Sequence, residues 1–175
     1  MEFKKHAMIL AVIDGLKEHG SWTGKTHVQK TLSLLHDKGE IEVPFEFVLY
    51  RHGPYSFDVQ AELEQMRSYT AIEIEVQGQG YGVVLRRGPM AIYADRMGEL
   101  SPNEKQAIAK VCRFVGNKGV KDLEKLATAS WIRRWEGKTD PQAVAKRLHE
   151  LKPHIPEAAA LLADNEIQGW LGVTA

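Results

Sequence analysis

Cysteine is the scarcest residue that matters in this chain: one, Cys112, among 175 residues. A single thiol cannot form an internal disulfide or supply a thiolate cage for a metal ion. The chain is therefore neither a disulfide-stapled secreted scaffold nor a cysteine-rich zinc module. One reduced cysteine is typical of proteins from a reducing compartment, so we expect a cytoplasmic protein.

Long apolar runs are also missing. No stretch approaches the about 20 apolar residues that a bilayer-spanning helix needs. The apolar segment Ala7 to Ile13 follows two lysines and faintly resembles a signal peptide. Asp14 and then Lys17-Glu18 interrupt it, and no small-residue cleavage site follows. We expect no membrane partner.

Neither sign of charge is in excess, because Lys and Arg total 23 and Asp and Glu also total 23. The whole chain has no electrostatic attraction for nucleic acid or anionic lipid, and such binding would need a local patch. The hydrophobic fraction of 43% and the four tryptophans indicate a folded protein. A chain of this length forms one compact domain or two small ones.

Motifs for catalysis and metal binding are lacking as well. Gly24-Lys25-Thr26 looks like the end of a phosphate-binding loop, but the position where the first glycine belongs is His19. The seven histidines are irregularly spaced and form no His-Glu-x-x-His motif. Cys112 falls on the apolar face of its predicted helix and is better explained as a buried residue than as a nucleophile, although a Cys–His pair stays open. We expect no catalytic residue, no cofactor and no metal ligand, and hence not an enzyme.

The first half has the element order of a winged helix. Periodicity predicts a helix over Phe3–His19, a second from a Thr23 cap to Gly39, a strand over Phe45–Tyr50 and a third helix capped by Ser56. A hairpin of Ile72–Val76 and Tyr81–Arg86 follows, joined by an uncharged loop. We therefore expect a winged-helix-like domain over residues 1–89.

The second half, residues 99–175, is predicted to be a helical domain packed against the first. Ser101-Pro102-Asn103-Glu104 combines a capping box with proline at the first helical position. Further helices follow from Val120 to the Trp131 and Trp135 pair, from Asp140-Pro141, and through an alanine-rich end near Trp170. Met90 to Gly98 has no clear period and is expected to connect the halves. The predicted fold class is α+β, mainly helical.

The stretch Tyr50 to Ser56 joins aromatic and basic residues to a Gly-Pro turn. Such a turn is stiff, and aromatic and arginine anchors with a low ordering cost are typical of protein interfaces. The exposed side of the 25–36 helix is expected to complete the surface. The predicted partner-binding residues are Lys25, Gln29, Lys30, Tyr50, Arg51, His52, Gly53, Pro54 and Tyr55. An open alternative is that Tyr50 and Tyr55 simply pack the strand onto the first helix.

DNA binding is the rival function, because winged helices commonly place their third helix in the major groove. That helix carries three acidic residues, Asp58, Glu62 and Glu64, and only one basic residue, Arg67. The wing loop, Gln77 to Gly80, has no lysine or arginine. Since basic side chains supply most non-specific DNA affinity, this surface opposes a polyanion. Two interpretations are open for Lys25, Lys30, Arg51, Arg86 and Arg87: an ordinary solvated face, or a basic patch elsewhere on the surface. The second keeps a DNA-binding transcriptional regulator as the alternative.

Taken together, the motifs resemble the Panacea domain of SocA-like antitoxins and the related YwgA-like proteins. The similarity covers roughly residues 24 to 136 and rests on Thr26 to Lys30, Phe45 to Tyr50, Gly53 to Ser56, Leu100 to Glu104, Leu123 to Leu126 and Trp131 to Trp135. It implies a non-catalytic antitoxin or adaptor of toxin–antitoxin or phage-defence context, whose protein partner is a toxin or a protease or chaperone system. Tyr55, where many Panacea domains have an aliphatic residue, and Thr128-Ala129-Ser130, in place of a Thr-His pair, depart from the pattern.

Overall fold

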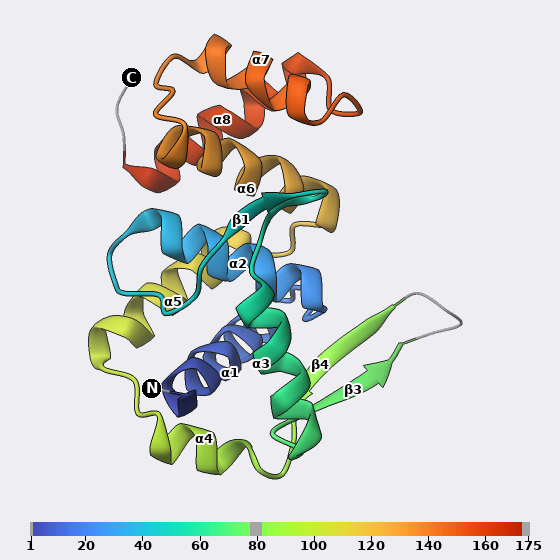
Figure 1. Cartoon of the computed structure of the whole chain (residues 1–175), viewed down its shortest axis with the longest axis vertical. Coiled ribbons are helices and arrows are strands. Elements are labelled where there is room, and N and C mark those ends of the chain that lie inside the picture. The colour runs from blue at the N-terminus through green and yellow to red at the C-terminus, as the bar shows by residue number, and fades with distance from the viewer. Residues whose placement is uncertain (1, 78–81, 173–175) are drawn as a thin grey trace.

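The computed structural model describes residues 2–77 and 82–172. Within them the chain is mainly helical, with two small antiparallel sheets (Figure 1). The helices are α1 (Glu2–Glu18), α2 (Lys25–Lys38), α3 (Phe57–Ser68), α4 (Ala91–Met97), α5 (Pro102–Val115), α6 (Val120–Trp135), α7 (Pro141–Leu151) and α8 (Glu157–Leu171). The strands are β1 (Val48–Tyr50), β2 (Gly53–Tyr55), β3 (Ile72–Val76) and β4 (Val83–Arg87).

Helix starts follow the capping chemistry that the sequence predicts. The Ser56 hydroxyl accepts a hydrogen bond from the Val59 amide at 3.2 Å and begins α3. At α5 the capping box is complete, because Ser101 and Glu104 each accept a bond from the other's backbone amide. At α7 the Asp140 carboxylate accepts a hydrogen bond from the Ala143 amide at 2.7 Å. At α2 the prediction was wrong: Gly24 is the N-cap, and the hydroxyl of Thr23 donates instead to the Leu85 carbonyl of β4.

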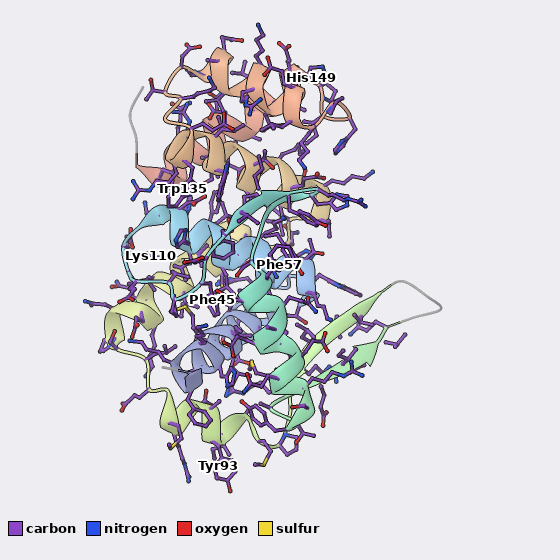
Figure 2. All side chains as sticks on the ribbon, viewed as in Figure 1. Phe45, Phe57, Tyr93, Lys110, Trp135 and His149 are labelled. Carbon is purple, nitrogen blue, oxygen red and sulfur yellow. The ribbon has the colours of Figure 1, made fainter. Side chains whose placement is uncertain are left out.

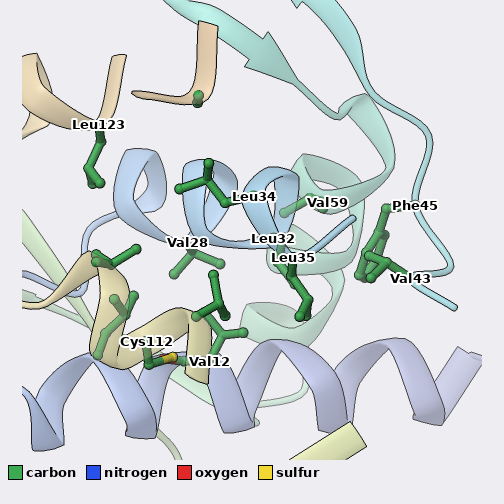
Figure 3. Close-up of a cluster of buried hydrophobic side chains, with 14 of the residues drawn as sticks. Val12, Val28, Leu32, Leu34, Leu35, Val43, Phe45, Val59, Cys112 and Leu123 are labelled. Carbon is green, nitrogen blue, oxygen red and sulfur yellow. The ribbon is translucent and has the colours of Figure 1, made fainter. Parts of the chain in front are cut away.

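Helix α2 lies at the centre of the molecule, with α1 and α5 packed on one side and α6, α8 and β2 on the other (Figure 1). The buried hydrophobic side chains of both halves of the chain belong to one cluster. Figure 3 shows part of it, where Val12 of α1 and Cys112 of α5 lie below Val28 of α2, and Leu123 of α6 lies above. The two predicted domains therefore share a core.

The two sheets are separate hairpins. In the first, Val48 pairs with Tyr55 and Tyr50 with Gly53; in the second, β3 pairs with β4. The predicted strand from Phe45 is therefore shorter than expected, because Phe45 and Phe47 are buried in the core instead of joining the ladder. The wing loop and Tyr81 fall outside the described residues apart from Gln77.

The connection predicted between the halves contains a helix, α4. It is only seven residues long, and of its residues only Ala91 and Ala94 are buried, both against the core. Its larger apolar residues, Ile92, Tyr93 and Met97, are exposed, which is why the segment shows no helical period in hydrophobicity. In the part of the chain that the structure covers, no helix combines the length and the apolar character needed to cross a bilayer.

Candidate functional site

The β1–β2 hairpin lies against α2 (Figure 1), and buried polar side chains of that helix bind its backbone. Lys30 donates from Nζ to the Pro54 carbonyl at 2.7 Å. The amide of Gln29 donates to the Ser56 carbonyl at 2.8 Å and accepts from the Ser56 backbone amide at 3.0 Å. In the described structure the hairpin has no third strand to pair with. The side chains of α2 bind these backbone N–H and C=O groups instead, and this fixes the hairpin to α2.

This geometry corrects the prediction that Gln29 and Lys30 lie on an exposed side of the helix. Each side chain is buried, with Lys30 only 2% exposed. Val28, Leu32 and Leu35 form one packed face of this helix, but the opposite face is covered too, by α6 and the hairpin. Of the three predicted residues on this helix, Lys25 alone is partly exposed, and its Nζ contacts Glu64 at 2.6 Å.

A second buried lysine holds the other end of the hairpin. Lys152, which follows α7, is 5% exposed and donates to the carbonyls of Tyr50 and Arg51. No sequence pattern singles it out, because its partners lie about a hundred residues earlier in the chain. The hairpin is thus clamped from two directions by lysines that the sequence would place in solvent.

Glu124 of α6 is also buried, and its charge acts on both lysines. Its carboxylate is 3.9 Å from Lys152 Nζ, 3.7 Å from His52 Nδ1 and 3.4 Å from His154 Nε2. Burial lowers the pKa of Lys30 to about 8, with the negative charge of Glu124 opposing the shift and the positive charge of Lys152 adding to it. The pKa of Lys152 is also lowered by burial and raised in part by Glu124. One carboxylate thus supports the cations that clamp the hairpin.

Three aromatic rings gather on the outer face of this clamped hairpin. The Tyr55 and Phe57 ring centroids are 5.1 Å apart, and those of Tyr50 and Phe57 are 5.9 Å apart. Tyr50 is 51% exposed and Phe57 60%, and neighbouring Val48 is exposed as well. Figure 2 shows Phe57 where the hairpin enters α3. Tyr50 and Tyr55 pack on each other and on Phe57, a residue that the sequence reasoning did not select.

A pocket of about 230 Å³ brings together most of the predicted residues. Seven of the nine line it: Lys25, Gln29, Lys30, Tyr50, His52, Gly53 and Tyr55. The remaining two are Arg51, which is exposed at the hairpin end, and Pro54, which is buried. His52 also lines a second pocket of about 580 Å³ against α6 and the start of α8.

Ion pairs occupy most of the charged residues considered for DNA binding. On α3, Glu62 pairs with Lys5 and His6, and Glu64 pairs with Lys25 and Arg67. Lys5, Lys25 and Arg67 therefore neutralise Glu62 and Glu64, two of the three acidic residues of this helix. The suggested basic patch does not form from its five residues, because Lys30 is buried, Arg86 pairs with Glu75, and Arg87 pairs with Asp14 and Asp95.

Cys112 is fully buried, and burial raises the pKa of its thiol to about 12. Its sulfur lies 3.7 Å from the Val12 carbonyl. A thiol that stays protonated at neutral pH is a poor nucleophile. Among residues 2–77 and 82–172, no group of three or more His, Cys, Asp or Glu side chains is arranged to hold a metal ion.

Comparison with known proteins adds no family: no protein-family model matches the chain, and no curated protein matches it. The resemblance to Panacea domains therefore stays a prediction that rests on its motifs. The structure does bring two of those motifs into contact, since Gln29 and Lys30 bind the backbone of Pro54 and Ser56.

Proposed function

We propose that this protein is a non-enzymatic cytoplasmic binding module, an antitoxin or adaptor of the Panacea type, that docks a protein partner. The docking surface is the hairpin face, which we define as Tyr50, Arg51, His52, Tyr55 and Phe57. The partner is a toxin, or a protease or chaperone system. The first 89 residues are the winged-helix-like part of this module, with the hairpin face at the entry to its third helix.

The exposed aromatic cluster on a clamped backbone carries the proposal. Aromatic and arginine side chains dominate the binding energy of protein interfaces. Ordering such side chains costs free energy on binding, and a pre-ordered surface avoids part of that cost. Here Lys30 and Lys152 hold the hairpin backbone, while the rings of Tyr50 and Phe57 remain more than half exposed. Burying those rings against a partner would remove their apolar surface from water, which favours binding.

A DNA-binding regulator is the weaker alternative. Its third helix would approach DNA with balanced rather than positive charge, because each of Glu62 and Glu64 is already paired with a cation. The strand β1 pairs with β2, and among the described residues it does not join β3 and β4 as one sheet. A gel shift with random duplex at low salt tests this reading, since saturable binding that weakens steeply with salt would favour the regulator.

The docking surface is tested with the double variant Tyr50→Ser/Phe57→Ser. Both side chains are exposed, so we expect the fold to persist, as judged by circular dichroism and melting temperature. Binding of the partner purified with the native protein should be lost in a one-to-one titration. The matched control is Tyr93→Ser on α4, at the far end of the molecule, where the side chain is 53% exposed (Figure 2). If the double variant binds like the native protein, the hairpin face is not the docking surface.

A further inference from the structure

We propose that the segment docking on the hairpin face is acidic, with carboxylates that enter the pocket beside His52. This inference rests on the proposed function and specifies the partner's chemistry. It assigns to the partner an apolar anchor for the rings of Tyr50 and Phe57, flanked by Asp or Glu residues.

The pocket has a volume of about 580 Å³ and adjoins the aromatic cluster through His52. Its walls come from three separate parts of the chain: the hairpin end, the first turns of α6, and the loop that leads into α8. A segment lying over the exposed rings would therefore reach the pocket without any change in the hairpin.

Basic residue types outnumber acidic ones in the lining of this pocket, with His52, Lys121, Lys125 and His154 against Glu124. Lys121 is exposed, and within the described chain it has no ion-pair partner. The His52 and His154 side chains are 77% and 60% exposed, and Arg51, which precedes His52 in the chain, is exposed as well. Lys125 also lines the pocket, paired with Asp122. The one acidic lining residue, Glu124, is buried, and its charge is balanced within the protein by Lys152, whose Nζ lies 3.9 Å from the carboxylate.

The first turns of α6 and α8 also border this pocket, and each turn carries one acidic residue, Asp122 in α6 and Glu157 in α8. Lys121 is the second residue of α6. At this position its positive charge is repelled by the positive end of the helix dipole, so it does not stabilise its own helix. The first turn of α8 also faces the pocket through Pro156 and Ala159, and its N-cap provides no side-chain hydrogen bond. Backbone amides at such a helix start favour carboxylates. An exposed lysine with a cost to its helix fits a role in recognition.

The rings favour a protein segment over single-stranded nucleic acid. Bases stack on open aromatic faces. The Phe57 ring meets Tyr55 at 77° and Tyr50 at 67°, so these rings turn edges toward faces and form a compact apolar knob rather than a parallel platform. Such a knob fits an apolar side chain of a partner, and the surrounding cations fit its acidic neighbours.

The test is a nuclear magnetic resonance titration of the full, uniformly ¹⁵N-labelled chain with synthetic peptides. Two 12-residue peptides carry the same central Phe and Leu residues, flanked in one by Glu and in the other by Gln. We expect the Glu peptide to bind about tenfold more tightly at low salt, because two or more charge pairs form at the surface. Its resonance shifts should fall on residues 50–57, 121–125 and 154–159. The variant Arg51→Gln/Lys121→Gln should lose most of that preference, and Lys105→Gln on α5 should retain it.

Several outcomes would overturn the inference. Equal binding of both peptides at the hairpin face would refute the acidic preference and leave the docking function intact. Shifts spread away from the hairpin, or no binding by either peptide, would refute it as well, while the Tyr50→Ser/Phe57→Ser experiment judges the docking function separately. Tighter binding of a 12-residue oligothymidylate on the same resonances would assign the surface to nucleic acid instead.

Discussion

At the scale of residues, buried polar side chains decide much of this structure. Asp37 accepts hydrogen bonds from Ser130 at 2.7 Å and from the indole of Trp135 at 3.0 Å, which fixes a half-exposed tryptophan on α6. Arg133 of α6 donates to both carboxylate oxygens of the fully buried Asp164 of α8. Buried charges of this kind are tolerated only when they are paired.

Because Arg133 pairs with Asp164, we expect substitution of Arg133 to lower the free energy of unfolding much more than substitution of its neighbour Arg134. Replacing Arg133 by Met leaves the Asp164 carboxylate buried without its cation, and removing one partner of a buried pair costs about 3–5 kcal/mol. Arg134→Met, at an exposed position, should change the free energy of unfolding by less than about 0.5 kcal/mol. Urea unfolding followed by circular dichroism measures both. Equal changes in the free energy of unfolding for the two substitutions would show that the ion pair does not stabilise the fold.

Lys30 predicts a pH-dependent contribution to stability. Its pKa is about 8 in the folded protein against 10.5 ordinarily, so between these values the unfolded state binds more protons. Stability from this group therefore rises with pH through that window. Relative to Lys30→Met, the free energy of unfolding of the native protein should increase by about 1 kcal/mol from pH 8 to pH 9. A difference that is flat or falling over that interval would show that Lys30 is fully charged in the fold.

At the scale of elements, the hairpin and α2 form one unit. Helix α2 has ten buried residues among its fourteen, including the two that bind the hairpin backbone. The close approach depends on Gly53, whose φ is +87° and whose missing Cβ leaves room for the hydroxyl of Thr128. A Cβ built there would lie 2.7 Å from that oxygen. This glycine permits both the turn and its packing on α6.

Gly53→Ala should accordingly destabilise the protein by about 1–3 kcal/mol, because a side chain at this φ is strained and also contacts Thr128. Gly169→Ala in α8 is the matched control, since the residue is helical and the added Cβ meets nothing within 4 Å apart from its chain neighbours and its own helix backbone. That control should stabilise by about 0.5–1 kcal/mol. Thermal and urea unfolding measure the change in stability of each variant. If Gly53→Ala leaves the stability unchanged, the tight packing of Gly53 against Thr128 is excluded.

At the scale of the whole molecule, both halves share one hydrophobic cluster, with α1 against α5 and α2 against α6. Separating the predicted domains would expose this shared surface. A single core of this kind is expected to unfold cooperatively. The halves distinguished by sequence are thus best regarded as parts of one folding unit.

Leu126→Ala tests this cooperativity. Leu126 of α6 is 2% exposed, and such a truncation costs about 2–5 kcal/mol. Hydrogen exchange should show the same loss of protection for the core amides of α1, in the other half of the chain. Leu162→Ala, at a side chain that is 72% exposed, should leave the exchange unchanged. Unaltered protection of α1 in Leu126→Ala would mean that the halves unfold independently.

Local patterns by themselves determined most of the elements. Caps at Ser56, Ser101 and Asp140 involve atoms at most three residues apart, so their helix starts could be read directly. The apolar spacing of α3 and α5 and the alternation of β3 likewise depend on neighbours. The candidate turn at 50–56 was recognisable for the same reason, since Gly-Pro and aromatic residues act locally.

Only the tertiary structure decided what covers each surface. Gln29 and Lys30 lie on the polar side of a helical stripe, and they are buried because α6 and the hairpin pack there. Lys152 and Glu124 complete the clamp from distant parts of the chain, and Phe57 joins the exposed rings through the hairpin's geometry. Burial and charge pairing are properties of long-range contacts. Periodicity reports one face of a helix, whereas the fold determines how many faces are packed.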